Sequence, residues 1–251
     1  MTLLEMVQSI LNSMDKENVN SITDLEESQQ IALTIKETYD NLMTDRDWSF
    51  LKLVTQLQAV GDLTQPTKIK IPVSIRKIEK LKYNKKELGD TTNKFLDVTY
   101  LSPVDFINIV CSRSSDDSNA VVSTLETGVP MVIHDDIAPM YWTSFDDEFI
   151  YFDSYDSAVD TTVQASKSLI YAVKAPTFTV DDTFEPDIPE KMLTMLLESA
   201  RRVCSKRFNQ QVDEEAEISS KKKYNSLRNR ESRSDGGLMR KIHNGGIKKR
   251  R

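Results

Sequence analysis

The side chains that most often do chemistry in proteins are few in this sequence. His134 begins the run His-Asp-Asp, whose side chains could ligate a metal ion, and the other histidine, His243, lies in the C-terminal tail. Neighbouring residues of a strand point to opposite faces, and no second histidine or cysteine stands at a useful spacing. We therefore expect His134 to end a strand before a turn, and we expect no metal site and no cofactor.

Acidic residues gather between positions 146 and 160. Such a run could supply the carboxyl groups of a glycosidase or the ligands of a cation. It lacks the EF-hand order of ligands with its central glycine, and nothing marks one carboxyl as buried and another as ionised. We interpret these residues as solvated turn residues, and an acid-dependent hydrolase remains the alternative. The members of the run are Asp146, Asp147, Glu148, Asp153, Asp156 and Asp160.

The motifs of common enzyme classes are missing. Only Gly61, Gly89 and Gly128 precede residue 236, so neither GxGxxG nor a P-loop can be written, and no GxSxG occurs. Cys111 and Cys204 lie far apart without CxxC spacing, which favours a reduced, cytosolic assembly compartment over a disulfide framework. Cys204 falls on the apolar side of a predicted helix and is interpreted as a core residue. We expect a protein that is not an enzyme.

Positive charge is concentrated at the C-terminus. Residues 219–251 hold 12 lysines and arginines against two acids, which leaves 21 basic and 37 acidic residues in 1–218. Such a tail could bind DNA phosphates without sequence preference, order on an acidic groove of another protein, or stay solvated. The residues predicted to contact a partner, an acidic protein or DNA, are Lys221, Lys222, Lys223, Arg228, Arg230, Arg233, Arg240, Lys241, Lys248, Lys249, Arg250 and Arg251.

Hydrophobic spacing predicts helices at both ends of the chain. Residues 3–15 are expected to form an amphipathic helix that Thr2 caps, with Glu5 three residues later. A second helix is expected over residues 24–45. The helical period returns at Pro189, and its apolar side thins after Gln210. The N-terminus has no basic region followed by an apolar core, so we expect no secretory signal, and no run is long enough to span a membrane.

The middle of the chain has the alternation of strands. Residues 69–75 alternate apolar and polar side chains, Pro72 favours an edge position, and a phase shift indicates a bulge near Lys77. Further strands are expected at 131–134, at 140–145 and 148–153 around the turn Asp146-Asp147, and in a hairpin of 159–165 with 169–173. A short helix is expected over Pro103–Val110.

These elements predict an α+β fold. A helical body of two N-terminal helices and a long C-terminal helix would carry an inserted, small, mainly antiparallel β domain and a basic C-terminal arm. The expected parts are an N-terminal helical part at 1–52, the inserted β domain at 53–180, the C-terminal helix at 181–231 and a flexible basic arm at 232–251.

Several stretches together resemble one family. They are MTLLEMVQSILNSMD, RDWSFL, IKIPVSIRKIEKLKYN, YLSPVDF, PMYWTSFDDEFIYFDSYDS, PDIPEKMLTMLLESARRVCSKRFNQQ and KKKYNSLRNR. In this order they look like the head–tail adaptor proteins of tailed bacteriophages, the group that includes tail tubular protein A of short-tailed phages. The likeness covers nearly the whole chain, and its most specific part is YWTSFDD. The final SDGGLMRKIHNGGIKKRR departs from the pattern.

The resemblance implies a virion structural protein of the neck. Such adaptors form a homo-oligomeric ring, commonly of twelve subunits, below the portal, with a channel through which DNA passes without sequence-specific binding. Residues 219–251 would then be the arm that meets the portal, and the β domain would meet the downstream tail protein. The implied protein is assembled in the host cytoplasm, with no membrane partner. The alternative is a nucleic-acid-binding module that acts through the basic tail.

Overall fold

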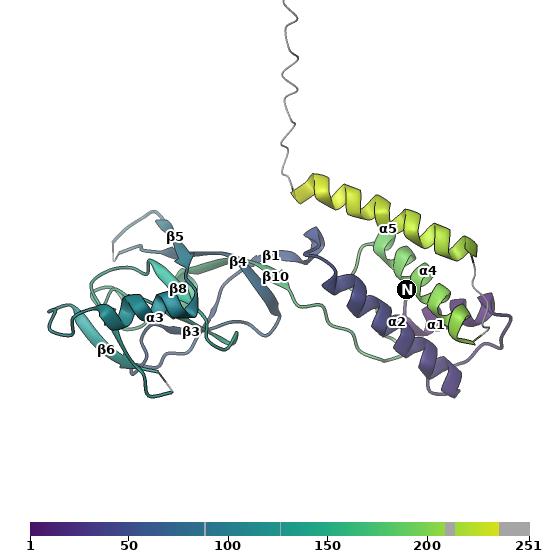
Figure 1. The fold of residues 1–251 in the computed structure, drawn as a ribbon, viewed down its shortest axis with the longest axis horizontal. Coiled ribbons are helices and arrows are strands. Elements are labelled where there is room, and N and C mark those ends of the chain that lie inside the picture. The colour runs from purple at the N-terminus through teal and green to yellow at the C-terminus, as the bar shows by residue number, and fades with distance from the viewer. Residues whose placement is uncertain (88, 126, 209–213, 236–251) are drawn as a thin grey trace, which may run out of the picture. The chain divides into compact units, whose positions relative to one another are not determined.

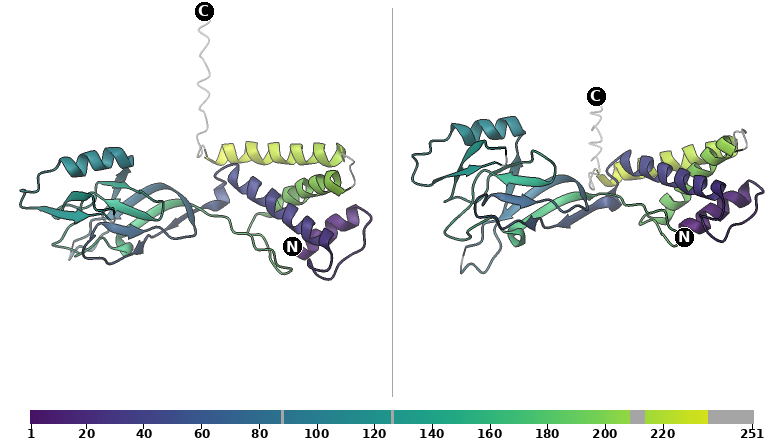
Figure 2. Two further views of the ribbon diagram at one scale, coloured as in Figure 1. Left: turned by 60° about the horizontal axis from the view of Figure 1, so that its bottom comes forward. Right: turned by 90° about the horizontal axis from the view of Figure 1, so that it is seen from below.

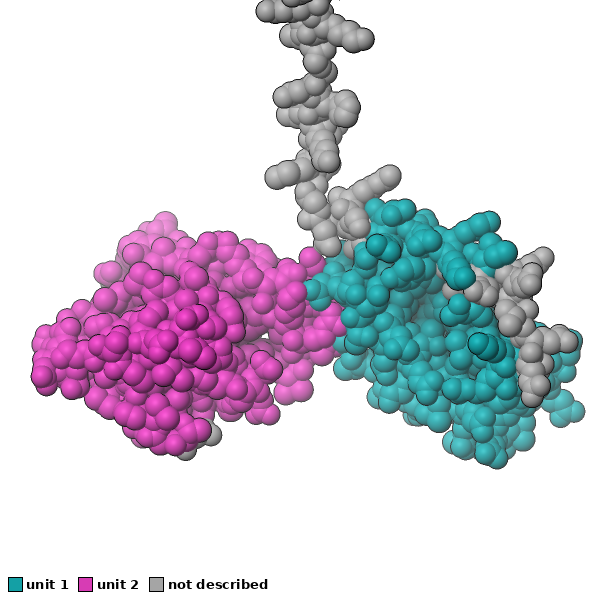
Figure 3. Space-filling model, in the orientation of Figure 1, with its two compact units in different colours: residues 1–50, 176–251 teal, residues 51–175 magenta. Residues whose placement is uncertain are grey.

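The chain folds into two compact units in this computed structural model, which describes residues 1–235 except 88, 126 and 209–213 (Figures 1 and 3). The helical unit comprises Met1–Phe50 and the described part of Pro176–Arg251. The sheet unit comprises Leu51–Ala175. No helix among the described residues has the length and apolar character needed to cross a membrane.

Helix α1 (Leu3–Ser13) shows how the sequence defines the helical unit. Thr2 Oγ1 accepts a hydrogen bond from the Glu5 N–H at 3.2 Å, and Glu5 Oε2 accepts one from the Thr2 N–H at 2.8 Å. This capping box satisfies two N–H groups that the first turn leaves without helical partners. Apolar residues at steps of three and four place one side of α1 in the core, namely Leu3, Met6, Val7, Ile10 and Leu11.

Helices α2 (Glu26–Thr44) and α4 (Glu190–Phe208) complete that core. Ile31, Ile35 and Tyr39 of α2 are buried, as are Leu196 and Cys204 of α4. The extended segment at 176–189 belongs to the same packing. The ring of Phe178 contacts Tyr39 and Phe184, with centroids 5.1 and 4.6 Å apart.

Helix α5 (Glu214–Asp235) lies along α4 in both views of Figure 2. The sequence predicted one helix through this region, but α4 ends at Phe208 and α5 is a second helix. The predicted arm at 232–251 begins inside α5, and its residues 236–251 lie outside the described part of the chain.

An eight-stranded curled sheet forms most of the sheet unit. Its strand order is β1-β10-β4-β5-β8-β9-β3-β2, and all neighbours are antiparallel except β5 and β8. The apolar side chains inside the curl form one core, which includes Ile69, Leu81, Val98, Ile150 and Phe152. The strands are β1 (Lys52–Thr55), β2 (Gln58–Ala59), β3 (Lys68–Lys70), β4 (Ile75–Asn84), β5 (Phe95–Tyr100), β8 (Tyr141–Thr143), β9 (Phe149–Phe152) and β10 (Ser168–Lys174).

A second core lies beside this sheet. The hairpin of β6 (Ala120–Thr124) and β7 (Pro130–His134) packs with α3 (Pro103–Ser112), whose N-cap is Ser102. The apolar residues of this core are Phe106, Val110, Leu125, Met131, Ile133 and Tyr151.

The predicted fold class is wrong. The chain is a mixed α/β protein dominated by the eight-stranded sheet, with five α-helices among the described residues, and not a helical body that carries a small inserted β domain. The sequence analysis missed β1, β2, β5 and β6, because these strands are short or largely exposed and lack a clear alternation. In β5, for example, Val98 alone is buried.

Two local predictions are also corrected. The predicted strand at 69–75 is interrupted at Pro72, since β3 ends at Lys70 and β4 begins at Ile75. Residues 159–165 form turns and the start of a 3₁₀ helix, η2 (Ala165–Lys167), and β10 pairs with β1 and β4 instead. The bulge expected near Lys77 is confirmed, because the β10–β4 register shifts at Glu79 and at Arg76.

Candidate functional site

Helix α5 carries the described half of the predicted basic region. Two polar contacts attach its middle to the helical unit. Lys223 Nζ lies 3.3 Å from Glu198 Oε1 of α4, and the Tyr224 hydroxyl donates a hydrogen bond to Asp45 Oδ2 after α2. This hydrogen bond raises the pKa of Tyr224, because it favours the protonated phenol, and burial raises it further.

Arg46 gives α5 a third contact. Its Nη1 atom donates to the Arg228 carbonyl oxygen at 3.5 Å, and its guanidinium lies over the Trp48 ring, 5.4 Å from the centroid. Trp48 is itself fixed in the core, since its Nε1–H donates to the Leu42 carbonyl at 2.8 Å. The described contacts of α5 are therefore largely polar, and Ile218 on this helix is half exposed.

The predicted contact residues fall into three groups. Lys221, Lys222 and Arg228 are exposed on α5, whereas Lys223 is half-buried beside Glu198. Arg230 and Arg233 lie on the backbone of α5, and their side chains are outside the described part. The six remaining predicted residues, Arg240, Lys241, Lys248, Lys249, Arg250 and Arg251, also lie outside the described residues. The described surface of α5 thus offers exposed cations on a helix, a chemistry suited to phosphates or carboxylates.

The acidic run of the sheet unit fits the prediction only in part. Asp146, Asp147 and Glu148 are exposed in the turn between β8 and β9, as predicted, but Asp153 is not. Asp153 is 2% exposed, so it is not a solvated turn residue. Its Oδ1 accepts hydrogen bonds from the N–H groups of Met140 at 3.1 Å and Tyr141 at 2.8 Å. Its Oδ2 accepts one from Arg113 Nη2 at 2.8 Å, and Arg113 Nη1 also donates to the Asp153 carbonyl at 2.6 Å. Asp153 therefore joins the end of β9 to β8 and to the loop after α3.

Other members of the run also hold the chain in place. Asp146 Oδ1 accepts from the N–H groups of Glu148 and Phe149 at 3.0 and 2.9 Å and so closes the turn between β8 and β9. Asp156 accepts from the Ala158 N–H, and Asp160 pairs with Lys167. The structure brings no two of these acids together against a substrate-sized cavity, within the described residues. A loss of activity in an Asp153 variant would therefore be confounded by a loss of folding.

The histidine and cysteines are dispersed. His134 ends β7, as predicted, and within the described residues no three potential ligands among His, Cys, Asp and Glu cluster as a metal site would require. Cys204 is buried, as predicted, and burial raises its thiol pKa to about 11. Cys111 is exposed, with its Sγ 3.4 Å from the Pro130 carbonyl.

The sequence analysis missed Arg113 and Asp153 as a structural pair. The available signal was an acid directly after the buried strand Phe-Ile-Tyr-Phe, a position at which a carboxylate needs a partner. Comparison with known proteins adds no assignment. No model of a protein family matches the chain, and a search of curated proteins finds no significant match.

Proposed function

We propose that this chain is a virion structural protein, a head–tail adaptor that forms an oligomeric ring between the portal and the tail of a bacteriophage. The ring would surround a channel through which DNA passes without sequence-specific binding. The family resemblance of the sequence supports this proposal, including YWTSFDD and the C-terminal KKKYNSLRNR. We propose no catalytic role, because Asp146, Asp153 and Asp160 serve the fold.

The observation that carries the proposal is the surface of α5. Lys221, Lys222 and Arg228 are exposed on a helix that continues toward six further basic residues. These cations are exposed at one end of a chain whose remaining residues are strongly acidic. This contrast favours docking of the basic end alone on an acidic partner. We assign that partner as the portal protein, and the sheet unit as the part that meets the downstream tail protein.

A charge reversal on α5 tests the portal contact. Lys221→Glu with Lys222→Glu should weaken binding to the portal of the same virus by about tenfold or more, as rim charges control complementarity. The matched control is Lys191→Glu with Lys206→Glu, because these exposed residues of α4 give the same change in net charge. Binding is measured by surface plasmon resonance, and rings by electron microscopy of the mixture. Equal binding by both double variants would refute the α5 contact.

Removal of residues 219–251 is a second test of the portal contact. The truncated chain should lose portal binding, while its sheet unit should keep its fold as judged by Trp142 fluorescence. Assembly of a normal portal complex by the truncated chain would overturn the assignment of this arm.

A nucleic-acid-binding module is the second candidate, and the exposed cations of α5 favour it too. In that case the chain alone should bind DNA of any sequence, and log K should fall linearly with log salt, by about 0.9 for each phosphate neutralised. The measurement is fluorescence anisotropy with a labelled duplex. Strong binding that depends on Lys221 and Lys222, together with no portal binding, would favour this candidate.

A further inference from the structure

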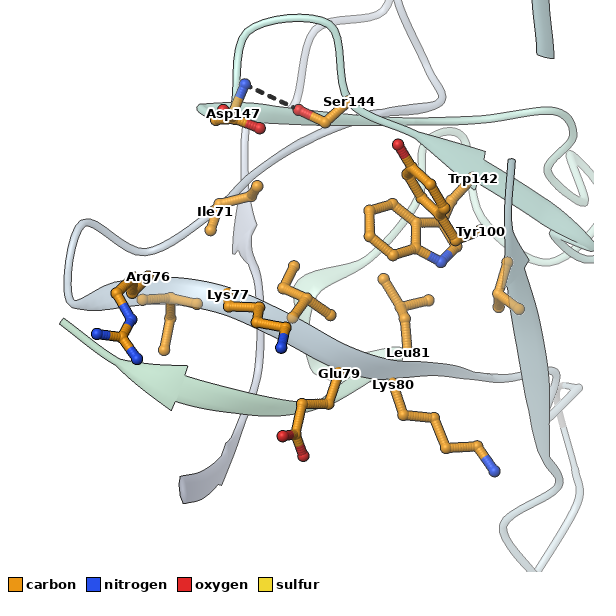
Figure 4. A pocket seen from close by; sticks show the side chains of 13 residues that line it. Ile71, Arg76, Lys77, Glu79, Lys80, Leu81, Tyr100, Trp142, Ser144 and Asp147 are labelled. Carbon is orange, nitrogen blue, oxygen red and sulfur yellow. Dashed lines mark hydrogen bonds between the residues drawn. The ribbon is translucent and has the colours of Figure 1, made fainter. Parts of the chain in front are cut away.

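Strand β5 divides its pairing between two neighbours. Its residues Phe95–Val98 pair with Asn84–Leu81 of β4, but Thr99 and Tyr100 pair with Tyr141 and Trp142 of β8. Strand β4 continues beyond this point to Ile75, with β10 along its other side. The sheet therefore splits where β5 leaves β4, and the split opens into a groove of about 500 Å³ (Figure 4).

The floor of this groove is apolar. Leu81 and Trp142 point toward one another across it, and Tyr100 packs edge-on against Trp142 with centroids 4.9 Å apart (Figure 4). Ile71 and Val98 also line the groove. Leu81, Val98 and Trp142 are 1%, 5% and 8% exposed and form the buried base of the groove. Tyr100 is 54% exposed and Ile71 is half-buried, so these two side chains carry apolar surface that the chain itself does not cover.

The opposite face of β4 is basic. The side chains of Glu79 and Lys80 lie on the side of β4 that faces away from Trp142 in Figure 4. Lys80 and Lys82 share one carboxylate, Asp97, at 2.9 and 3.3 Å, and Glu79 is paired with Lys52 at 3.3 Å. Two lysines on one carboxylate leave this face with an excess of positive charge.

We propose that the groove binds an extended segment of a partner protein, which adds as a strand beside β4 in the place that β5 leaves at Val98. A sheet edge offers backbone groups to such a segment, and pockets for alternate side chains give it specificity. Side chains of an added strand alternate between the two faces. Those on the groove side meet Tyr100 and Ile71, and those on the other side meet Lys80. The segment therefore alternates apolar and acidic residues.

Charge argues against a segment of this chain, or of a second copy of it, as the strand that binds in the groove. The C-terminal residues 236–251 contain six lysines and arginines and no acid, so they have the same sign as β4. A second copy of β4 would place like charges opposite one another, which destabilises cross-strand pairing. The acidic and apolar segment at 176–189 is engaged in its own helical unit through Phe178 and Phe184. The occupant is thus a different protein.

A selection from displayed random peptides of twelve residues tests the proposal on the full chain. We expect the selected peptides to alternate apolar and acidic residues. Lys80→Glu should weaken their binding at least tenfold, and Lys82→Glu should not. The control is closely matched, because both lysines contact Asp97 and lie two residues apart on β4, but β5 already covers β4 at Lys82.

Hydrogen exchange separates strand addition from docking by side chains alone. A selected peptide should slow exchange of β4 amides between Ile75 and Lys80, with no change in the part that β5 covers. Failure to select any peptide, selection of basic or helical peptides, or unchanged exchange in β4 would overturn the proposal. Peptides that match a segment of this chain would assign the groove to a second copy and also overturn it. These outcomes are independent of the portal proposal, since the α5 variants leave the sheet unit unchanged.

Discussion

The sheet unit and the helical unit use ion pairs in different environments. In the sheet unit, the side chains of Arg113 and Asp153 are 16% and 3% exposed, and the carboxylate accepts two backbone hydrogen bonds as well. On α5, the side chain of Lys223 is 38% exposed and that of its partner Glu198 is 22% exposed. Water screens the second pair far more than the first.

This difference separates charge that holds the fold from charge that remains available. A buried carboxylate without its partners costs several kcal/mol, so Asp153 is tied to the stability of the sheet unit. Lys221, Lys222 and Arg228 of α5 are exposed, so we expect their replacement to cost the fold little. Surface charge of that kind controls encounter with a partner, which is the role we propose for α5.

The largest effect is expected from Asp153→Ala. This change leaves Arg113 and two N–H groups without their carboxylate, and should cost about 3–5 kcal/mol of unfolding free energy. The measurement is urea unfolding in a Trp48→Phe background, where Trp142 fluorescence reports the sheet unit alone. The control is Asp97→Ala in the same unit, because Asp97 is 56% exposed and its pairs should contribute about 1 kcal/mol or less. Equal losses in the two variants would contradict the structural role of Asp153.

As the pH rises above 9, the helical unit should lose stability before the sheet unit does. In the helical unit, burial raises the pKa of Cys204 from 9.0 to about 11, and mainly burial raises that of Tyr39 from 10.0 to about 12. In the sheet unit, burial raises the pKa of Tyr83 from 10.0 to about 12. The folded state favours the neutral form of each group. The contribution of each group to the free energy of unfolding is therefore complete below its unfolded pKa, and it is lost as the pH rises through the folded pKa. Each should account for about 3 kcal/mol.

The helical unit should therefore begin to lose stability near pH 9 and the sheet unit near pH 10. Urea unfolding of single-tryptophan variants from pH 8 to 12, with Trp48 or Trp142 retained, follows the two units separately. In Cys204→Ala, the loss that begins near pH 9 should disappear from the helical unit, whose remaining loss should begin near pH 10 with Tyr39. If both units began to lose stability at the same pH, the assignment to Cys204 would be wrong.

Sequence periodicity predicted the helices better than the strands. The capping pair of Thr2 and Glu5 and the apolar spacing that follows are local signals, and α1 begins where they indicate. Helices α2 and α3 were also predicted to within two residues. The strands depend on distant partners. In β5 only one residue of six is buried, so apolar alternation is weak. Its first four residues pair with β4 and its last two with β8, and no local pattern records that change.

The two candidate surfaces, the basic side of α5 and the groove beside β4, also differ in how far the sequence predicts them. Lys221 and Lys222 can be recognised as basic in the sequence, and their exposure on α5 needs only that they lie on the outer side of a helix. The groove between β4 and β8 could not be predicted, because it arises where β5 changes neighbours. Asp153 could be named as acidic but not as buried, since Arg113 lies 40 residues away in the chain.

A smaller effect is expected from Tyr224→Phe. The change removes the hydrogen bond to Asp45 but keeps the ring, and should cost about 0.5–1.5 kcal/mol in the docking of α5. Hydrogen exchange of the α5 amides should become faster, while α1 and α2 keep their protection. Faster exchange throughout the helical unit would show instead that α5 unfolds only with the whole unit.

The smallest effect is expected from Lys223→Ala, and its size decides whether the comparison holds. The pair with Glu198 is partly in water, so its loss should cost about 0–1 kcal/mol and should depend weakly on salt. Arg113→Ala, which leaves Asp153 buried without its cation, should cost about 3–5 kcal/mol under the same conditions. Urea unfolding gives both values. A cost for Lys223→Ala close to that for Arg113→Ala would mean that the charges of α5 hold the helical unit together, and the reason to assign them to a partner would be lost.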